Sequence, residues 1–128
     1  MENIDIDLFL TDYLNTASWV TCDSDENSEF TIEAIERAKK DCISFIADVK
    51  HSFGEEKGTE LLTIEGIDFG YLSAHDFYLT RNGHGTGFWD RDEIYGGMNG
   101  AILTTLCESM GSSNAYHVRG KKSKLTFE

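Results

Sequence analysis

Apolar side chains recur at three- and four-residue steps between residues 32 and 53, a period that requires a long helix with one buried face. The recurring positions are Ile32, Ile35, Ala38, Cys42, Phe45, Ile46, Val49 and Phe53. Thr31 precedes the repeat and is a suitable N-cap, while Gly54 follows it and is a suitable stop. The sequence therefore predicts a helix over residues 32–52 that packs on the core along one side.

Three further segments are predicted to be helical, and one to be a loop. Apolar residues at helical spacing predict helices over residues 5–15 and 98–110. Their predicted inward positions are Ile6, Phe9, Leu10, Tyr13 and Leu14 in the first, and Ala101, Ile102, Leu106 and Met110 in the second. Residues 60–74 fit either a short helix or a short strand, and we favour the helix. Residues 21–30 are rich in Asp, Ser, Asn and Glu, which predicts a solvated loop.

Two segments are predicted to be β-hairpins. In residues 76–91, alternating apolar and aromatic residues flank the run Arg81-Asn82-Gly83-His84-Gly85, and Asn-Gly is typical of tight hairpin turns. In residues 115–127, two short β-prone runs flank Gly120-Lys121-Lys122. We therefore expect one α+β domain over residues 1–128. Its antiparallel sheet has three to four strands from two hairpins, and about three helices cover one face. Residues 1–68 are predicted to be mostly helical, and residues 69–128 to form hairpin, helix and hairpin.

Negative charge is concentrated in the first half of the chain. Residues 1–68 contain 17 acidic and 5 basic side chains, whereas residues 69–128 contain 6 of each, so the first half holds the whole net charge of −12. Because DNA binding normally uses Lys and Arg to replace the counterions around phosphates, direct binding to nucleic acid is disfavoured. The run Lys121-Lys122-Ser123-Lys124 is interpreted as a solvated turn.

The chain has the features of a cytoplasmic protein with reduced thiols. It has no apolar stretch of the roughly 18 residues needed to span a bilayer, and its start lacks the basic residues of a signal peptide. Cys22, Cys42 and Cys107 are widely spaced and odd in number, which argues against a disulfide framework. We expect Cys42 and Cys107 to be small buried residues on helices.

Residues 75–91 read HDFYLTRNGHGTGFWDR and are the most distinctive string in the chain. They resemble the signature of a family of small, acidic bacteriophage proteins of uncharacterised function, which carry HDFWLTRNGHGAGFWDR or close variants. The resemblance extends to Ser18-Trp19 and to the step Lys40-Asp41-Cys42, so it covers nearly the whole chain. Ala74, Tyr78 and Thr86 depart from the pattern. The resemblance implies a phage origin and a location in the host bacterial cytoplasm, but it implies no reaction and no catalytic residue.

Residues 75–91 allow three interpretations. In the first, the glycines form a turn, Asn82 caps it, and Arg81 pairs with Asp90 or Asp76. In the second, exposed side chains form a binding surface, because Trp and Arg contribute most at interfaces. The candidate binding residues here are Arg81, Asn82, His84, Trp89, Asp90 and Arg91. In the third, nitrogen and oxygen ligands for a metal such as zinc come from His75, Asp76, His84 and Asp90. A phosphate loop at Gly83-x-Gly85-x-Gly87 is disfavoured, because no helix is expected to follow it.

The favoured functional hypothesis is a phage accessory protein, without enzymatic activity or a cofactor, that binds a host protein. Carboxylates spaced along the predicted long helix suggest imitation of DNA phosphates in an anti-defence role. The candidate mimic residues are Glu29, Glu33, Glu36, Asp41 and Asp48. The alternatives are a metal-assisted hydrolase or nucleotide-processing enzyme, and a virion or assembly component. The expected partner is a host protein rather than nucleic acid or membrane, and the chain is expected to be a monomer or a small homo-oligomer.

Overall fold

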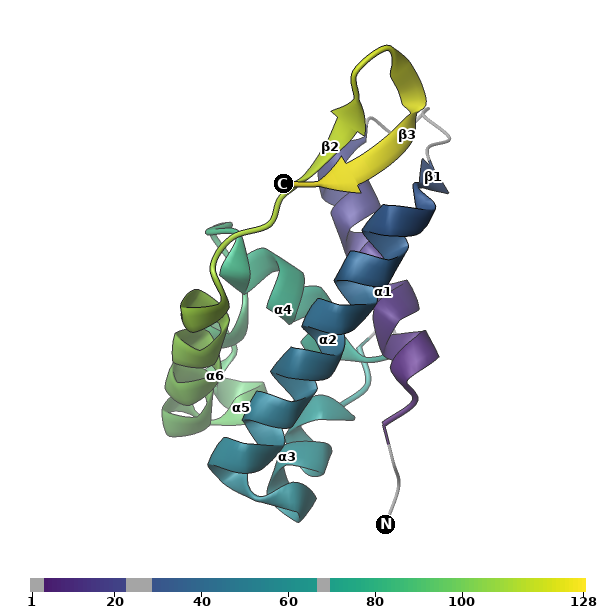
Figure 1. The fold of residues 1–128 in the computed structure, drawn as a ribbon. Coiled ribbons are helices and arrows are strands. Elements are labelled where there is room, and N and C mark those ends of the chain that lie inside the picture. The colour runs from purple at the N-terminus through teal and green to yellow at the C-terminus, as the bar shows by residue number, and fades with distance from the viewer. Residues whose placement is uncertain (1–3, 23–28, 67–69) are drawn as a thin grey trace.

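The computed structural model describes residues 4–22, 29–66 and 70–128 and has a mainly helical α+β fold (Figure 1). The helices in these residues are α1 (Ile6–Thr21), α2 (Ile32–Phe53), α3 (Glu55–Leu62), α4 (Leu72–Arg81), α5 (Asp92–Tyr95) and α6 (Gly97–Met110), with a short 3-10 helix, η1, at Phe88–Asp90. The strands are β1 (Glu29–Phe30), β2 (Ala115–Val118) and β3 (Lys121–Phe127). Within the described ranges, no helix is long and apolar enough to cross a membrane.

Helix α2 runs along much of the length of the molecule, with the small sheet near its beginning and α3 at its end (Figure 1). Thr31 caps it as predicted, because its hydroxyl accepts a hydrogen bond from the Ala34 N–H at 3.1 Å. Gly54 ends the helix with a φ of 92°. The predicted helix is thus confirmed, and its buried residues are Ala34, Ala38, Cys42, Phe45, Ile46 and Val49. The predicted inward positions Ile32 and Ile35 are wrong, since both are exposed.

Helix α4 forms the centre of the core. It packs against α1, α3, α6 and η1, and all ten of its residues are buried. The ring of Phe77 stacks on Phe45 of α2, with 4.1 Å between the ring centroids, and the ring of Tyr13 from α1 lies 5.2 Å from Phe77. Aromatic packing therefore joins three helices at this point.

The predicted sheet is wrong, because its first hairpin does not exist. Residues 72–81 are the helix α4, and residues 88–90 are the 3-10 helix η1. The observed sheet has three strands in the order β1-β3-β2, with β1 parallel and β2 antiparallel to β3. The second predicted hairpin is confirmed as β2 and β3. A helix buried on every side shows no polar face, so its apolar residues do not reveal a helical period.

The Asn82-Gly83 step ends a helix instead of joining two strands. The His84 N–H donates to the Leu79 carbonyl at 3.0 Å, and the Gly83 N–H donates to the Thr80 carbonyl at 3.2 Å. This is the Schellman pattern of a helix C-terminus, and Gly83 supplies its positive φ of 71°. Asn82 has a φ of −98°, whereas a type I′ hairpin turn needs positive φ at both positions.

The other predicted helices are present with different limits. Helix α1 continues to Thr21, beyond the predicted end at residue 15. The segment 60–74 contains the end of α3 and the start of α4, while its residues 67–69 lie outside the described ranges. In α6 the buried residues are Gly100, Leu103 and Cys107. Of the predicted inward positions, Leu106 and Met110 are partly buried against the core, whereas Ala101 is exposed. Gly100 lies against η1 instead, where a Cβ would be 2.8 Å from the Phe88 carbonyl oxygen.

Two remaining predictions concern the loop and the thiols. Most of the predicted loop 21–30 falls on residues 23–28, which lie outside the described ranges, and its last two residues form β1. None of the three cysteines forms a disulfide, and Cys42 and Cys107 are buried on helices as predicted. Burial raises the pKa of both thiols, so they remain protonated at neutral pH.

Candidate functional site

Arg81, at the end of α4, lies inside the protein and joins four helices. Its guanidinium contacts the Asp41 carboxylate of α2 at 2.8 Å and the Tyr13 hydroxyl of α1 at 3.2 Å. Its Nε donates to the carbonyl oxygen of Gly111, just after α6, at 2.9 Å. The predicted exposure of Arg81 is therefore wrong, as is its predicted pairing with Asp90 or Asp76. Its position indicates a structural role.

Asp76 is fully buried and connects α4 to the segment that follows the loop. Arg91 Nε lies 3.0 Å and 2.9 Å from its two carboxylate oxygens, and the Tyr95 hydroxyl donates to it at 3.0 Å. Burial raises the pKa of Asp76 to about 6, although the charge of Arg91 acts in the opposite direction. The carboxylate is thus mostly ionised at neutral pH and holds Arg91 against the core.

His75 faces a different neighbour from Asp76, although the two are adjacent in sequence. Its Nδ1 lies 2.9 Å from the Thr16 hydroxyl of α1, and its ring centroid is 6.0 Å from that of Trp19. Burial, followed by the nearby charge of Arg91, lowers the pKa of His75 to about 4. The imidazole is therefore neutral at neutral pH and acts as a packing and hydrogen-bonding group.

Hydrogen bonds also fix both ends of the loop between α4 and η1. Asn82 accepts from the Ser113 N–H at 2.7 Å and donates to the Tyr78 carbonyl at 3.0 Å. The Thr80 hydroxyl accepts from the Phe88 N–H at 3.1 Å. A Cβ on Gly87 would overlap that hydroxyl, so the close approach of loop and helix requires glycine.

Asp90 and His84 complete the loop. The exposed Asp90 accepts from the Gly87 N–H and from the Thr86 hydroxyl, each at 3.0 Å, and the bond from Gly87 lowers the pKa of Asp90. The His84 ring stacks on Tyr78, with 6.1 Å between centroids. Among the described residues, His84 Nε2 is a buried side-chain atom without a hydrogen-bond partner.

The four residues of the metal-site hypothesis do not converge. Asp76 contacts Arg91 and Tyr95, while Asp90 caps its own turn. His75 and His84 pack on different aromatic rings. Within the described part of the chain, no group of three or more His, Cys, Asp or Glu side chains is placed to hold a metal ion. The glycine run is followed by the three-residue η1, so the expectation against a phosphate loop still stands.

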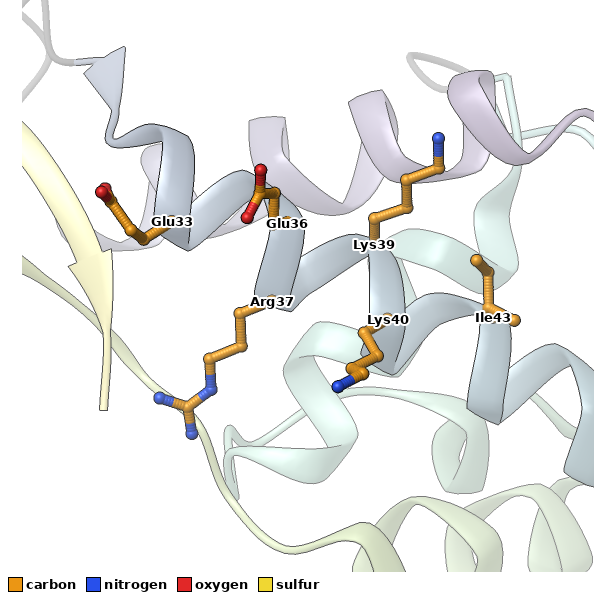
Figure 2. A pocket seen from close by; sticks show the side chains of 6 residues that line it. All are labelled: Glu33, Glu36, Arg37, Lys39, Lys40 and Ile43. Carbon is orange, nitrogen blue, oxygen red and sulfur yellow. The ribbon is translucent and has the colours of Figure 1, made fainter.

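The carboxylates of the DNA-mimic hypothesis lie among cations. Asp41 binds Arg81, and Glu29 lies 3.4 Å from Lys124. Glu33, Glu36 and Asp48 are exposed on α2, which contains four acidic and four basic residues in all. Figure 2 shows these two glutamates beside Arg37, Lys39 and Lys40 on the outer side of the helix. The excess of negative charge in the first half therefore comes from the segments that flank α2, a signal already present in the sequence.

Trp89 is exposed, as the binding interpretation predicts, but sequence reasoning missed two other exposed apolar residues on neighbouring elements, Ile94 and Met98. Trp89 on η1 is 50% exposed, and Ile94 of α5 and Met98 of α6 are also exposed. The three elements pack against one another. We call these three residues the Trp89 surface. Helices η1 and α5 are too short to show a period, and Met98 lies in the first turn of α6. The only sequence signal is therefore the presence of Ile94 and Met98 within ten positions of Trp89.

No family model, curated protein or solved structure matches the chain in comparisons with known proteins. The resemblance of residues 75–91 to a phage family thus stays a prediction from the sequence. The internal contacts of these residues account for much of the string in physical terms. Seven of its polar side chains, those of His75, Asp76, Thr80, Arg81, Asn82, Asp90 and Arg91, hold the helix, the loop or η1 in place.

Proposed function

We propose that this chain is a phage-encoded binding module that engages a protein of the host bacterium through the Trp89 surface. The observation that carries the proposal is the half-exposed Trp89. It stands in a string whose other side chains mostly make internal contacts. Large exposed apolar groups on a small protein often mark interaction sites, and Trp is enriched among residues that dominate binding energy. The phage origin rests on the resemblance of residues 75–91 alone.

The short helix that carries Trp89 is anchored to the core, which favours binding. Its neighbour Phe88 is fully buried, with ring centroids 5.9 Å from Phe45 and 5.0 Å from Tyr95. The Phe88 N–H is held by Thr80, and Asp90 caps the turn. A side chain on such a fixed element loses little conformational freedom when a partner covers it, so more of the contact energy appears as affinity.

Imitation of DNA by α2 is not part of the proposal. Of the five candidate carboxylates, Asp41 pairs with Arg81 and Glu29, on β1, pairs with Lys124. Glu33, Glu36 and Asp48 share α2 with four basic residues. A surface that imitates phosphates needs an uninterrupted negative potential, and balanced charges on one helix do not supply it. We therefore expect the affinity for the host partner to depend only weakly on salt.

Affinity capture from infected cells tests the proposal with two matched variants. The tagged wild-type chain, Trp89→Ala and Trp19→Ala are used as baits, and bound host proteins are identified by mass spectrometry. Trp19, on α1, is 71% exposed and lies outside the Trp89 surface, so it controls for the loss of any exposed tryptophan. We expect one host protein with wild type and Trp19→Ala that is lost with Trp89→Ala.

Two results would contradict the proposal. One is an unchanged set of captured proteins with Trp89→Ala, which would remove the Trp89 surface from binding. The other is the chain as a stoichiometric component of purified phage particles, which would favour the virion alternative. Circular dichroism and thermal unfolding of each bait verify that the variants are folded. Truncation of a central interface tryptophan typically costs about 2 kcal/mol or more, enough to abolish capture.

A further inference from the structure

One stripe on the outer side of α2 carries two exposed isoleucines with a charged residue pair between them. Ile32, Glu36, Lys39 and Ile43 follow one another at steps of four, three and four residues, so they share one face of the helix. Ile32 is 73% exposed and Ile43 is 50% exposed. Figure 2 shows Glu36, Lys39 and Ile43 on the same side of α2. We call these four residues the α2 stripe.

The stripe borders open surface rather than a cleft between elements. A shallow depression of about 560 Å³ beside Glu36, Lys39 and Ile43 is lined by residues of α2 alone. The depression of about 380 Å³ between α1 and α2 contains no residue of the stripe. The stripe side chains therefore project outward, where the side chains of a second helix can pack between them.

The order of residue types in the stripe is self-complementary. Along α2 it is apolar, acidic, basic, apolar, so an antiparallel second copy brings Ile32 opposite Ile43 and Glu36 opposite Lys39. Under two-fold symmetry each contact occurs twice, which gives two apolar pairs and two ion pairs. We propose that the α2 stripe is a homodimer interface in which two copies of α2 pack antiparallel. This proposal is independent of the Trp89 surface.

The ion pair that Lys39 makes within its own chain competes only weakly with the proposed contact to Glu36 of the second copy. Its Nζ lies 3.6 Å from the Asp7 carboxylate, and both side chains are exposed. Exposed pairs of this kind contribute little to stability. The four stripe positions span only about 17 Å at 1.5 Å per residue, so the interface is smaller than a standard one. The dimer is therefore reversible, with a dissociation constant on the order of micromolar.

Charge reversal with rescue tests the interface. Sedimentation equilibrium of the full chain, from about 1 to about 200 µM, gives the dissociation constant of each variant. Glu36→Lys or Lys39→Glu alone places two pairs of like charges in contact, and each weakens dimerisation about tenfold or more. The double variant Glu36→Lys/Lys39→Glu restores opposite charges across the axis, and its dissociation constant returns towards that of wild type.

Two variants off the stripe are matched controls. Glu33→Lys and Lys40→Glu change the net charge by the same amounts, and Lys40 points to the other side of α2 from Lys39 (Figure 2). Both dimerise like wild type. The proposal is overturned if wild type stays monomeric at the highest concentration, if the double variant is weaker than both single variants, or if Lys40→Glu is as damaging as Lys39→Glu. Thermal unfolding of every variant separates these outcomes from a loss of fold.

Discussion

Helix α4 takes part in two ion pairs, one with α2 and one with Arg91. The two pairs are buried in opposite ways. In the Arg81–Asp41 pair the cation is sealed and the Asp41 side chain is 27% exposed. In the Arg91–Asp76 pair the anion is sealed and the Arg91 side chain is 26% exposed. A buried carboxylate can accept a proton when it loses its partner, whereas a guanidinium keeps its charge. The two pairs should therefore respond differently to the loss of their exposed member.

The largest expected effect follows from removing Asp41. Asp41→Ala leaves the charge of Arg81 inside the protein without a counterion, which costs about 3 to 5 kcal/mol of unfolding free energy. Arg81→Met removes the charge itself and leaves Asp41 in contact with water, so it costs less, about 1 to 3 kcal/mol. Urea unfolding at neutral pH measures both values. A greater loss in Arg81→Met than in Asp41→Ala would contradict this account.

The pH dependence of stability separates the two pairs further. The pKa of Asp76 is raised from 3.8 to about 6 in the folded state, so its contribution is fully present below 3.8 and is lost as pH rises through 6. The pKa of His75 is lowered from 6.5 to about 4, so its contribution grows as pH rises from 4 to 6.5. Each effect is on the order of 3 kcal/mol, and the two nearly cancel.

Single substitutions separate the pH dependence of stability that Asp76 causes from the one that His75 causes. In His75→Gln only the contribution of Asp76 remains. The stability of this variant relative to wild type therefore falls as the pH rises from 4 to 6. In Asp76→Asn only the contribution of His75 remains, so the stability of this variant relative to wild type rises as the pH rises over the same range. Urea unfolding in steps across this window gives both curves. Parallel curves for the two variants would show that neither shift exists, while Arg81→Met is a control that should run parallel to wild type.

The loss of Arg91 is expected to be smaller than the loss of Asp41. In Arg91→Ala the Asp76 carboxyl loses its counterion, so its pKa rises above about 6 and it takes up a proton near neutral pH. Uptake of the proton limits the cost to about 2 kcal/mol at pH 7. The cost also shrinks at pH 5, where wild-type Asp76 is already largely protonated. A cost that is independent of pH would show that Asp76 stays ionised in the variant.

Helices α2 and α4 show how much of the fold the sequence determines. The length, caps and most of the buried face of α2 follow from its period, because one side of the helix meets water. Helix α4 is buried on all sides, so Phe77 and Leu79 mimic the alternation of a strand. Asn82-Gly83 strengthened that error, because glycine at positive φ serves a helix end as well as a hairpin.

The candidate site was predictable only in part. Residues 75–91 were identified as the distinctive segment, and the exposure of Trp89 agrees with the binding interpretation. The partners of Arg81 and Asp76 were not predictable, since Asp41 is 40 residues from Arg81 and Arg91 is 15 from Asp76. Long-range pairing of this kind depends on which helices pack together, and a single sequence contains no record of it.

The smallest effect concerns the turn that holds Arg91 within reach of Asp76. Gly87→Ala places a methyl group against the Thr80 hydroxyl, which also holds the Phe88 N–H, so η1 must shift. We expect the free energy of unfolding to fall by about 1 to 2 kcal/mol. The contact between Arg91 and Asp76 also weakens, which raises the pKa of the Asp76 carboxyl. Gly85→Ala is the matched control, because nothing lies within 4 Å of its Cβ position. Its stability should stay within about 0.5 kcal/mol of wild type. Equal losses in the two variants would mean that general loop flexibility, rather than the contact with Thr80, sets the position of Arg91.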